Sequence, residues 1–227
     1  MKKTILYAVA LVAMTACGAR AESGTAPAGT APAGKAVLTD AAMMDAAGPV
    51  KKISNPDYLL GISAIGFNAD GYINDLGWTV ENGEATNITR DSKGRLVSFD
   101  YVVFECDDEV PYKGAISRDA DGRITSLEYN GVKYIFSEYD DNGRVGKVVY
   151  HPGWSQEPEL TYTMQYDPQG RMTRVTMTYP DGTVNYTRFE YGASDSHGNW
   201  TERTEHIHQD GNDWAPQSGS RMLEYRN

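Results

Sequence analysis

The residues of this sequence that could hold a metal ion gather near its C-terminus. His206 and His208 are separated by one residue, so both imidazoles would lie on one face of a β-strand. Asp210 and Asp213 follow, and imidazole together with carboxylate can bind a zinc-like ion. Such a site needs three or four converging ligands, and this spacing brings only two together. We therefore predict a solvated edge strand and no metal site.

A second cluster combines a thiol with carboxylates. Asp107, Asp108 and Glu109 could bind Ca²⁺, but the alternating oxygen ligands of known calcium loops are missing. The adjacent Cys106 is a poor nucleophile, because neighbouring negative charge disfavours the thiolate. We predict a solvated acidic loop, with no catalytic residue and no cofactor.

Four arginines recur at the same place, each directly after a glycine: Arg95, Arg123, Arg144 and Arg171. They could form a basic row for an anionic ligand. Alternatively, each pairs with a neighbouring acid or packs across an aromatic ring, a contact that contributes only about 0–1 kcal/mol when exposed. We favour the structural role.

Aromatic residues are frequent in the last third of the chain. They are Trp154, Tyr162, Tyr166, Tyr179, Tyr186, Phe189, Tyr191, Trp200 and Trp214. Exposed Tyr and Trp on a rigid sheet can stack on sugar rings or anchor a protein partner. We expect most of them to pack the sheet, with Trp154, Trp200 and Trp214 as the candidates for ligand contact.

A seven-residue stretch, typified by Tyr166 to Met172, positions these side chains. Its second place is Asp or Asn, its fifth is Gly and its seventh is apolar, which is typical of a β-hairpin turn with a left-handed glycine. Six copies occur, and their glycines are Gly71, Gly94, Gly122, Gly143, Gly170 and Gly198. We predict that each copy is the tip of a hairpin.

The spacing and flanks of the repeats predict the fold. Successive glycines are 21 to 28 residues apart, enough for two strands and a return turn. Apolar residues alternate with polar ones after most of the turns. We expect an all-β antiparallel meander of about six hairpin repeats and ten to fourteen strands. It would form a twisted or curled single sheet, a partial barrel or a sandwich.

Composition limits the partners. The 227 residues carry a formal net charge of −10, which argues against nucleic acid as a partner. The sequence has two cysteines, Cys17 and Cys106, and no metal-type pairing of them.

The first 47 residues differ from the rest. Lys2 and Lys3 precede a short apolar run, so residues 1–16 are predicted to be a signal peptide. The end of that run resembles a bacterial lipobox, which implies a lipid on Cys17, although Ala19 to Ala21 also fits ordinary signal cleavage. Residues 17–47 would be a flexible tether containing a short helix within Leu38 to Ala47, and residues 48–227 the β-repeat domain.

The stretches YDDNGRV (139–145) and YDPQGRM (166–172) resemble the YD or RHS-type repeat. With its leader, the chain looks like small envelope lipoproteins of Bacteroides-like bacteria, which are largely of unknown function. The resemblance implies a β-strand architecture and supplies no catalytic residues.

We therefore expect a non-catalytic envelope lipoprotein, in the outer membrane or alternatively periplasmic or secreted, that presents a repeat-built β surface to a glycan or protein. Two alternatives stay open. A polysaccharide-acting hydrolase would need two carboxylates about 5 to 9.5 Å apart in a cleft. A purely structural envelope protein would bind no small ligand.

Overall fold

The repeated stretch folds locally, because its own hydrogen bonds close each turn. A computed structural model describes residues 39–54, 64–76, 84–105, 108–129, 131–153 and 159–227, all within one compact unit, Ala36–Asn227. The predictions for the signal peptide, Cys17, Cys106 and Trp154, and for the tether up to residue 38, lie outside these residues. In all six turns the Gly N–H donates to the Asp or Asn carbonyl at 2.8–3.0 Å. The six glycines have φ between +72° and +92°.

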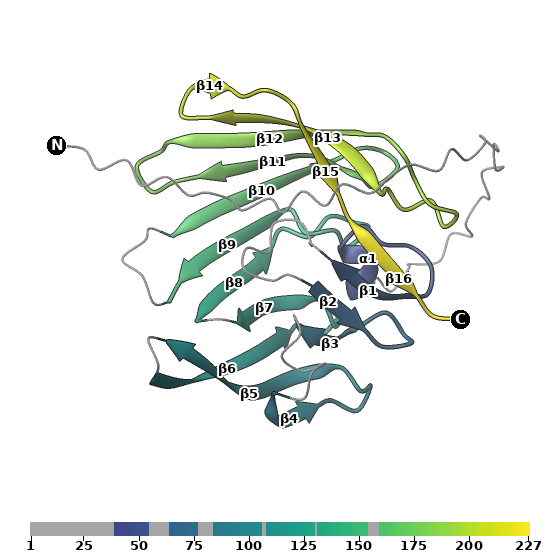
Figure 1. The fold of residues 1–227 in the computed structure, drawn as a ribbon, viewed down its shortest axis with the longest axis vertical. Helices are drawn as coiled ribbons and strands as arrows, with labels where there is room; N and C mark the ends of the chain where they lie inside the picture. Colours follow the sequence, from purple (N-terminus) through teal and green to yellow (C-terminus); the bar gives the residue numbers. More distant parts are fainter. Residues whose placement is uncertain (1–38, 55–63, 77–83, 106–107, 130, 154–158) are drawn as a thin grey trace. The chain divides into compact units, whose positions relative to one another are not determined.

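Twelve strands form one antiparallel sheet in which most neighbours in sequence are neighbours in space (Figure 1). Its order runs from β14 to β4, with β15 paired to β13, and the sheet is open between β4 and β14. The strands are β4 (Thr86–Arg90), β5 (Leu96–Glu105), β6 (Asp108–Arg118), β7 (Ile124–Tyr129), β8 (Val132–Ser137), β9 (Lys147–Pro152), β10 (Leu160–Tyr166), β11 (Met172–Thr178), β12 (Val184–Tyr191), β13 (Glu202–Gln209), β14 (Asn212–Asp213) and β15 (Gln217–Ser220).

A second sheet of four strands joins the two ends of the described chain. Its order is β16-β1-β2-β3, so the last strand pairs with the first. The strands are β1 (Val50–Ser54), β2 (Ala64–Phe67), β3 (Ile73–Leu76) and β16 (Met222–Tyr225), preceded by the helix α1 (Asp40–Met43). Among the described residues no helix is long and apolar enough to cross a membrane.

Both sheets and α1 share one hydrophobic core. Met43 of α1, Ile65 of the small sheet and Leu127 and Tyr134 of the large sheet belong to the same buried cluster. The small sheet and α1 therefore cover part of one face of the large sheet (Figure 1). The predicted antiparallel meander is confirmed. The twelve strands of the large sheet lie within the expected ten to fourteen, and among the described residues four further strands build the separate small sheet.

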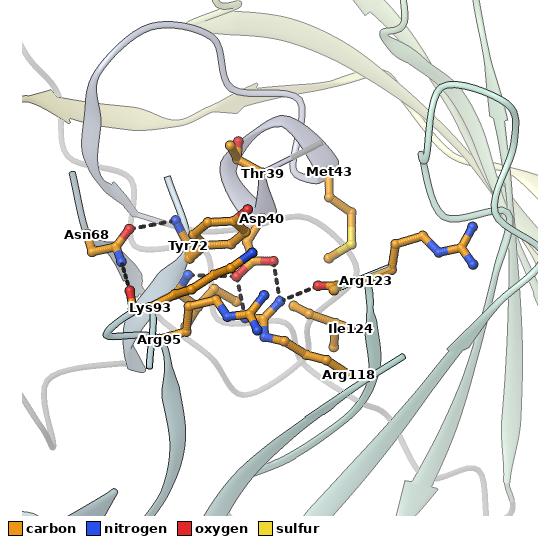
Figure 2. A network of polar contacts seen from close by, with 12 residues as sticks. Thr39, Asp40, Met43, Asn68, Tyr72, Lys93, Arg95, Arg118, Arg123 and Ile124 are labelled. Atoms are coloured by element: carbon orange, nitrogen blue, oxygen red, sulfur yellow. Dashed lines mark hydrogen bonds and ion pairs between the residues drawn. The ribbon is translucent and has the colours of Figure 1, made fainter. Parts of the chain in front are cut away.

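A buried ion pair fixes α1 to the first repeats. Thr39 caps the helix by accepting the N–H of Ala42 at 3.2 Å. Both Asp40 carboxylate oxygens accept from Arg118, at 2.5 and 2.7 Å, and Oδ2 also accepts the backbone N–H of Ile73 (Figure 2). The Asp40 and Arg118 side chains are only 4% and 8% exposed. The helix thus ties the turn of β2–β3 to the strand β6.

The residues that follow α1 contact the last repeat. Arg221 donates to the carbonyls of Met44 and Asp45 at 3.2 and 2.7 Å, which satisfies two carbonyls at the C-terminal end of the short helix. Asn199, at the sixth place of the last motif, exchanges two hydrogen bonds with the backbone of Ala47, at 2.6 and 2.8 Å. Residues 39–50 therefore connect the first and last hairpins of the described chain.

Candidate binding surface

The arginines after the motif glycines are held within their own turns. Each donates its Nε to the motif aspartate four residues earlier, at 2.5–2.8 Å. The pairs are Asp91–Arg95, Asp119–Arg123, Asp140–Arg144 and Asp167–Arg171. The predicted pairing with a neighbouring acid is present in all four, so these arginines do not form a free row for an anion.

The same arginines also link successive repeats. Arg144 lies over the ring of Tyr166 in the next hairpin, with Cζ 5.0 Å from the centroid. The Tyr166 hydroxyl donates to the Val145 carbonyl, which belongs to the same motif as Arg144, at 2.8 Å. Equivalent rungs, which we call the Tyr–Arg ladder, join Arg123 and Ile124 to Tyr139, and Arg171 and Met172 to Tyr191.

Hydrogen bonding tunes the motif carboxylates. Burial alone would raise the pKa of Asp91, but hydrogen bonds from Arg95 and from backbone N–H groups bring it below its ordinary value. The pKa values of Asp119 and Asp167 are lowered by the same balance of burial and hydrogen bonds. These carboxylates are therefore anionic partners of their arginines at neutral pH, with a structural role.

The tryptophans proposed for ligand contact lie in different environments. Trp200 is 3% exposed and lies between the guanidinium groups of Arg203 and Arg221, with Cζ at 4.4 and 4.2 Å from its ring. Trp200 is thus not available to a ligand, contrary to the sequence-based expectation, because Tyr191, Arg203 and Arg221 pack against its ring. Trp214 is 52% exposed.

The two histidines of β13 do lie on one face, as their spacing predicts, but each has its own carboxylate. His208 Nδ1 shares a hydrogen bond with Asp213 at 2.8 Å, whereas His206 Nε2 lies 3.3 Å from a Glu190 oxygen without forming a hydrogen bond to it. Within the described ranges no group of three or more His, Cys, Asp or Glu side chains could hold a metal ion.

The strongest candidate surface is the outer face of β11, β12 and β13, opposite the core. Val175 and Phe189 point to the core side, so their neighbours Arg174 and Arg188 point outward. Arg174 pairs directly with Arg188, and Arg188 pairs directly with His206. Three basic side chains therefore form a row across three adjacent strands.

A stack of side chains stiffens this row. Tyr186 on β12 has the Arg174 Cζ 3.9 Å from its ring centroid. On the other neighbouring strand, His208 stacks on the same ring with centroids 4.7 Å apart and planes inclined by 10°. The Arg174 Nε is buried and has no hydrogen-bond partner in the described part of the chain. We call Arg174, Tyr186, Arg188, His206 and His208 the β11–β13 patch.

The carboxylates at the rim of the patch pair with its histidines, not with its arginines. Glu190 and Asp213 are 74% and 80% exposed, and their partners are His206 and His208. Like charges placed directly opposite on a sheet repel each other. The adjacent Arg174 and Arg188 therefore form a place where an added anion is favourable. Trp214 directly follows Asp213 in the sequence, and its indole is exposed.

Reasoning from sequence missed Arg174 and Arg188 as candidates. Their signal is the alternation along β11 and β12, where the positions between core residues include two arginines and Tyr186. That alternation predicts which face of the sheet each residue lies on, but not which residue lies beside it on the next strand. The pairing register, which only the structure supplies, brings the two arginines together.

No protein-family model matches this sequence, and a search of the curated proteins finds no match. One similar solved structure is a porin-like protein from Bacteroides uniformis ATCC 8492, with a TM-score of 0.41 and 11% identity over 77% of this chain and 61% of that chain. Another is the TcdB2–TccC3–TEV structure, with a TM-score of 0.25 and 14% identity over 61% of this chain and 8% of that one. Both TM-scores lie below 0.5, so we argue the function from this chain's own residues.

Proposed function

We propose that this chain is a non-catalytic binding protein of the bacterial envelope whose β11–β13 patch takes an acidic glycan. The observation that carries the proposal is the direct pairing of Arg174 with Arg188 on an outward face, continued by His206. The chain as a whole has a formal net charge of −10, so a basic row stands out against its surroundings.

The shape of the patch favours a charged polymer over a neutral sugar. The ring of Tyr186 contacts Arg174 on one neighbouring strand and His208 on the other, which leaves little of its face for stacking on a sugar. Adjacent strands lie about 4.8 Å apart, so the three basic side chains span roughly 10 Å. Carboxylate or sulfate groups repeated along a glycan can contact such a row, and guanidinium groups bind them in bidentate fashion.

The proposed localisation in the envelope is based on the sequence. A basic start, a short apolar run and Cys17 suit export and lipid attachment, and the small, Pro-containing repeats after them suit a tether. An envelope protein meets acidic polysaccharides, whereas its net charge disfavours nucleic acid. A protein partner with an acidic segment is the competing occupant, and a purely structural role is the other alternative.

The test is a binding screen of the full chain against uronic-acid and sulfated glycans, with neutral glycans of the same length. The decisive variant is Arg188→Gln, because Arg188 is exposed and its replacement should not disturb folding. The matched control is Lys113→Gln, which removes the same charge from an exposed position on β6.

We expect saturable binding to an acidic glycan that weakens about tenfold in Arg188→Gln and not in Lys113→Gln, since a hydrogen bond to a charged group contributes about 1.5–3 kcal/mol. Trp214→Ala would report whether the neighbouring indole takes part. Binding to neutral glycans alone would contradict the role of the patch. Release of cleaved glycan in the same incubation would favour the hydrolase alternative. Absence of binding to every glycan of the panel would favour a protein partner or a structural role.

A further inference from the structure

A groove of about 310 Å³ lies beside the small sheet, away from the β11–β13 patch in the strand order. Its lining residues come from β1, β2, β3, the edge strand β4 and the C-terminus. They are Lys51, Lys52, Gly66, Phe67, Asn74, Asp75, Arg90 and Arg226. A groove of this volume is at the small end of ligand sites and is the size of a single sugar or a comparable metabolite.

The register of the small sheet opens this groove. Lys52 is opposite Gly66, and Gly66 is opposite Asp75, so these three residues share the face away from the core. Gly66 has no side chain, and a Cβ added there would lie 2.8 Å from the Asp75 Cβ. The glycine therefore lets the Asp75 side chain approach the middle strand closely, and no larger residue fits at this position of the lining. Arg90 closes one side by donating to the Asn74 carbonyl at 3.1 Å.

The lining carries an excess of positive charge. Among the residues that the structure describes, the groove is lined by four basic side chains and one carboxylate, which are Lys51, Lys52, Arg90, Arg226 and Asp75. A second carboxylate, on Glu224, lies 3.7 Å from Lys51 and is about half exposed. In this described part of the lining, basic side chains therefore outnumber carboxylates even when Glu224 is included. Concave surfaces lined by one sign of charge attract the opposite charge strongly.

One lining residue of the groove, Arg226, has a buried donor without a hydrogen-bond partner in the described part of the chain. The Nε of Arg226 is buried and has no hydrogen-bond partner among the residues that the structure describes, although the Arg226 backbone N–H donates to Pro49 at 2.9 Å. A buried donor without a partner is unfavourable unless a ligand or a water satisfies it. The backbone bond holds Arg226 in place beside the groove.

We propose that this groove binds a sugar-sized anion through a carboxylate or phosphate group, held by Arg226 and Arg90 with Lys52 beside them. The shared chemistry is a planar or tetrahedral set of anionic oxygens, which guanidinium groups bind in bidentate fashion. Asn74 and Asp75 supply polar groups that suit sugar hydroxyls. This site is separate from the surface proposed for the acidic glycan.

The experiment titrates the full chain with glucuronate, glucose 6-phosphate and glucose, followed by calorimetry and by backbone amide shifts. Glucuronate and glucose 6-phosphate separate the carboxylate from the phosphate source, and glucose is the neutral control. The variants are Arg226→Gln and Arg90→Gln, each checked for unchanged thermal stability. Lys113→Gln is the matched control, because it removes one positive charge from an exposed position on β6, outside both the groove and the β11–β13 patch.

We expect one of the two anions to bind one-to-one, with amide shifts at Lys52, Asn74 and Arg226 and at least tenfold weaker binding of glucose. Arg226→Gln and Arg90→Gln should each weaken binding of the anion about tenfold, whereas Lys113→Gln should leave its affinity unchanged. Equal binding of glucose, absence of binding of either anion at millimolar concentration, or full affinity in both arginine variants would overturn the proposal.

Discussion

The aspartate at the second place of the motif makes several contacts at once. In Asp167, Oδ1 accepts the backbone N–H of Arg171 at 2.9 Å while Oδ2 accepts its Nε at 2.8 Å. The backbone N–H of Asp167 donates to the Arg171 carbonyl, and its carbonyl accepts from Gly170. One side chain and one peptide unit thus complete the hairpin, which explains why the motif can recur with varied third and fourth residues.

Stability should fall in acid through these carboxylates. The pKa of Asp167 is lowered on folding, so its ionised form stabilises the protein above the unfolded-state pKa of about 3.9, and this stabilisation is lost as the pH falls through the lower folded-state value. We expect Asp167→Asn to reduce the free energy of unfolding by about 1 kcal/mol at pH 7. Denaturant unfolding from pH 7 to pH 2 should show this gap closing below about pH 4. A gap that persists at pH 2 would contradict the ion pair, and exposed Asp70→Asn is the control.

Two motif glycines separate the effect of backbone conformation from that of packing. Gly170 has φ +92°, and an added Cβ would lie 2.7 Å from Arg144 Nη1, whereas Gly94 has φ +72° and nothing within 4 Å of such a Cβ. Both Gly→Ala variants should lose about 1–2 kcal/mol from left-handed strain. Gly170→Ala should lose more, because Arg144 is held by Asp140. Equal losses in denaturant unfolding would contradict the contact, and adding Arg144→Ala should remove the difference.

At the scale of elements, the Tyr–Arg ladder couples each hairpin to the next. Tyr166→Phe removes the hydroxyl that donates to Val145 but keeps the ring over Arg144, and should cost about 0.5–1.5 kcal/mol. Tyr166→Leu also removes the cation–π contact, which contributes about a further 0.5–1 kcal/mol. Denaturant unfolding measures both. Tyr186→Phe on the outer face is the control, and a loss as large as that of Tyr166→Phe would contradict the ladder.

The helix α1 depends on one ion pair for its attachment. Removing one partner of a buried pair leaves a buried charge and typically costs about 3–5 kcal/mol. We expect Asp40→Asn to destabilise by about that amount, since both side chains of the Asp40–Arg118 pair are less than a tenth exposed. The control is Asp121→Asn, because Asp121 is 75% exposed and should change stability by only about 0–1 kcal/mol. Similar melting temperatures for the two variants would show that α1 is not fixed in this way.

At the scale of the whole molecule, the anchoring prediction concerns residues outside the described ranges. If Cys17 carries the lipid, Cys17→Ser should move the protein from the membrane fraction to the soluble fraction, because a lipid chain supplies the membrane affinity. Cys106→Ser is the matched control and should leave the fractionation unchanged. Detection of each variant by immunoblot after fractionation is the measurement. Continued membrane retention of Cys17→Ser would remove the lipid-anchor hypothesis.

Contacts between the ends of the described chain complete the domain. β16 pairs with β1, Arg221 caps the carbonyls after α1, and Asn199 binds Ala47. The His197 ring also stacks on Tyr225, with centroids 4.2 Å apart. The first three contacts join residues more than a hundred positions apart, and they help to cover part of the apolar face that a meander alone would leave exposed.

The sequence by itself determined the hairpins and the all-β class. The backbone hydrogen bonds that close each motif turn lie within five consecutive residues, so local residue types are sufficient to specify the turn. The alternation of apolar residues then assigns the core face of most strands, as at Leu127 and Tyr129. The pairing of motif aspartate with motif arginine follows from the same short spacing.

Only the tertiary structure decided which surfaces remain for a ligand. The sequence presents Trp200 as a candidate for ligand contact, but Arg203 and Arg221 pack against its ring in the buried interior. Strand register brought Arg174 beside Arg188, and the closing of the small sheet brought Arg226 into one groove with Arg90. These juxtapositions depend on contacts between distant segments. Local residue preferences do not predict these contacts between distant side chains. The contacts stabilise the protein only when the whole core is assembled.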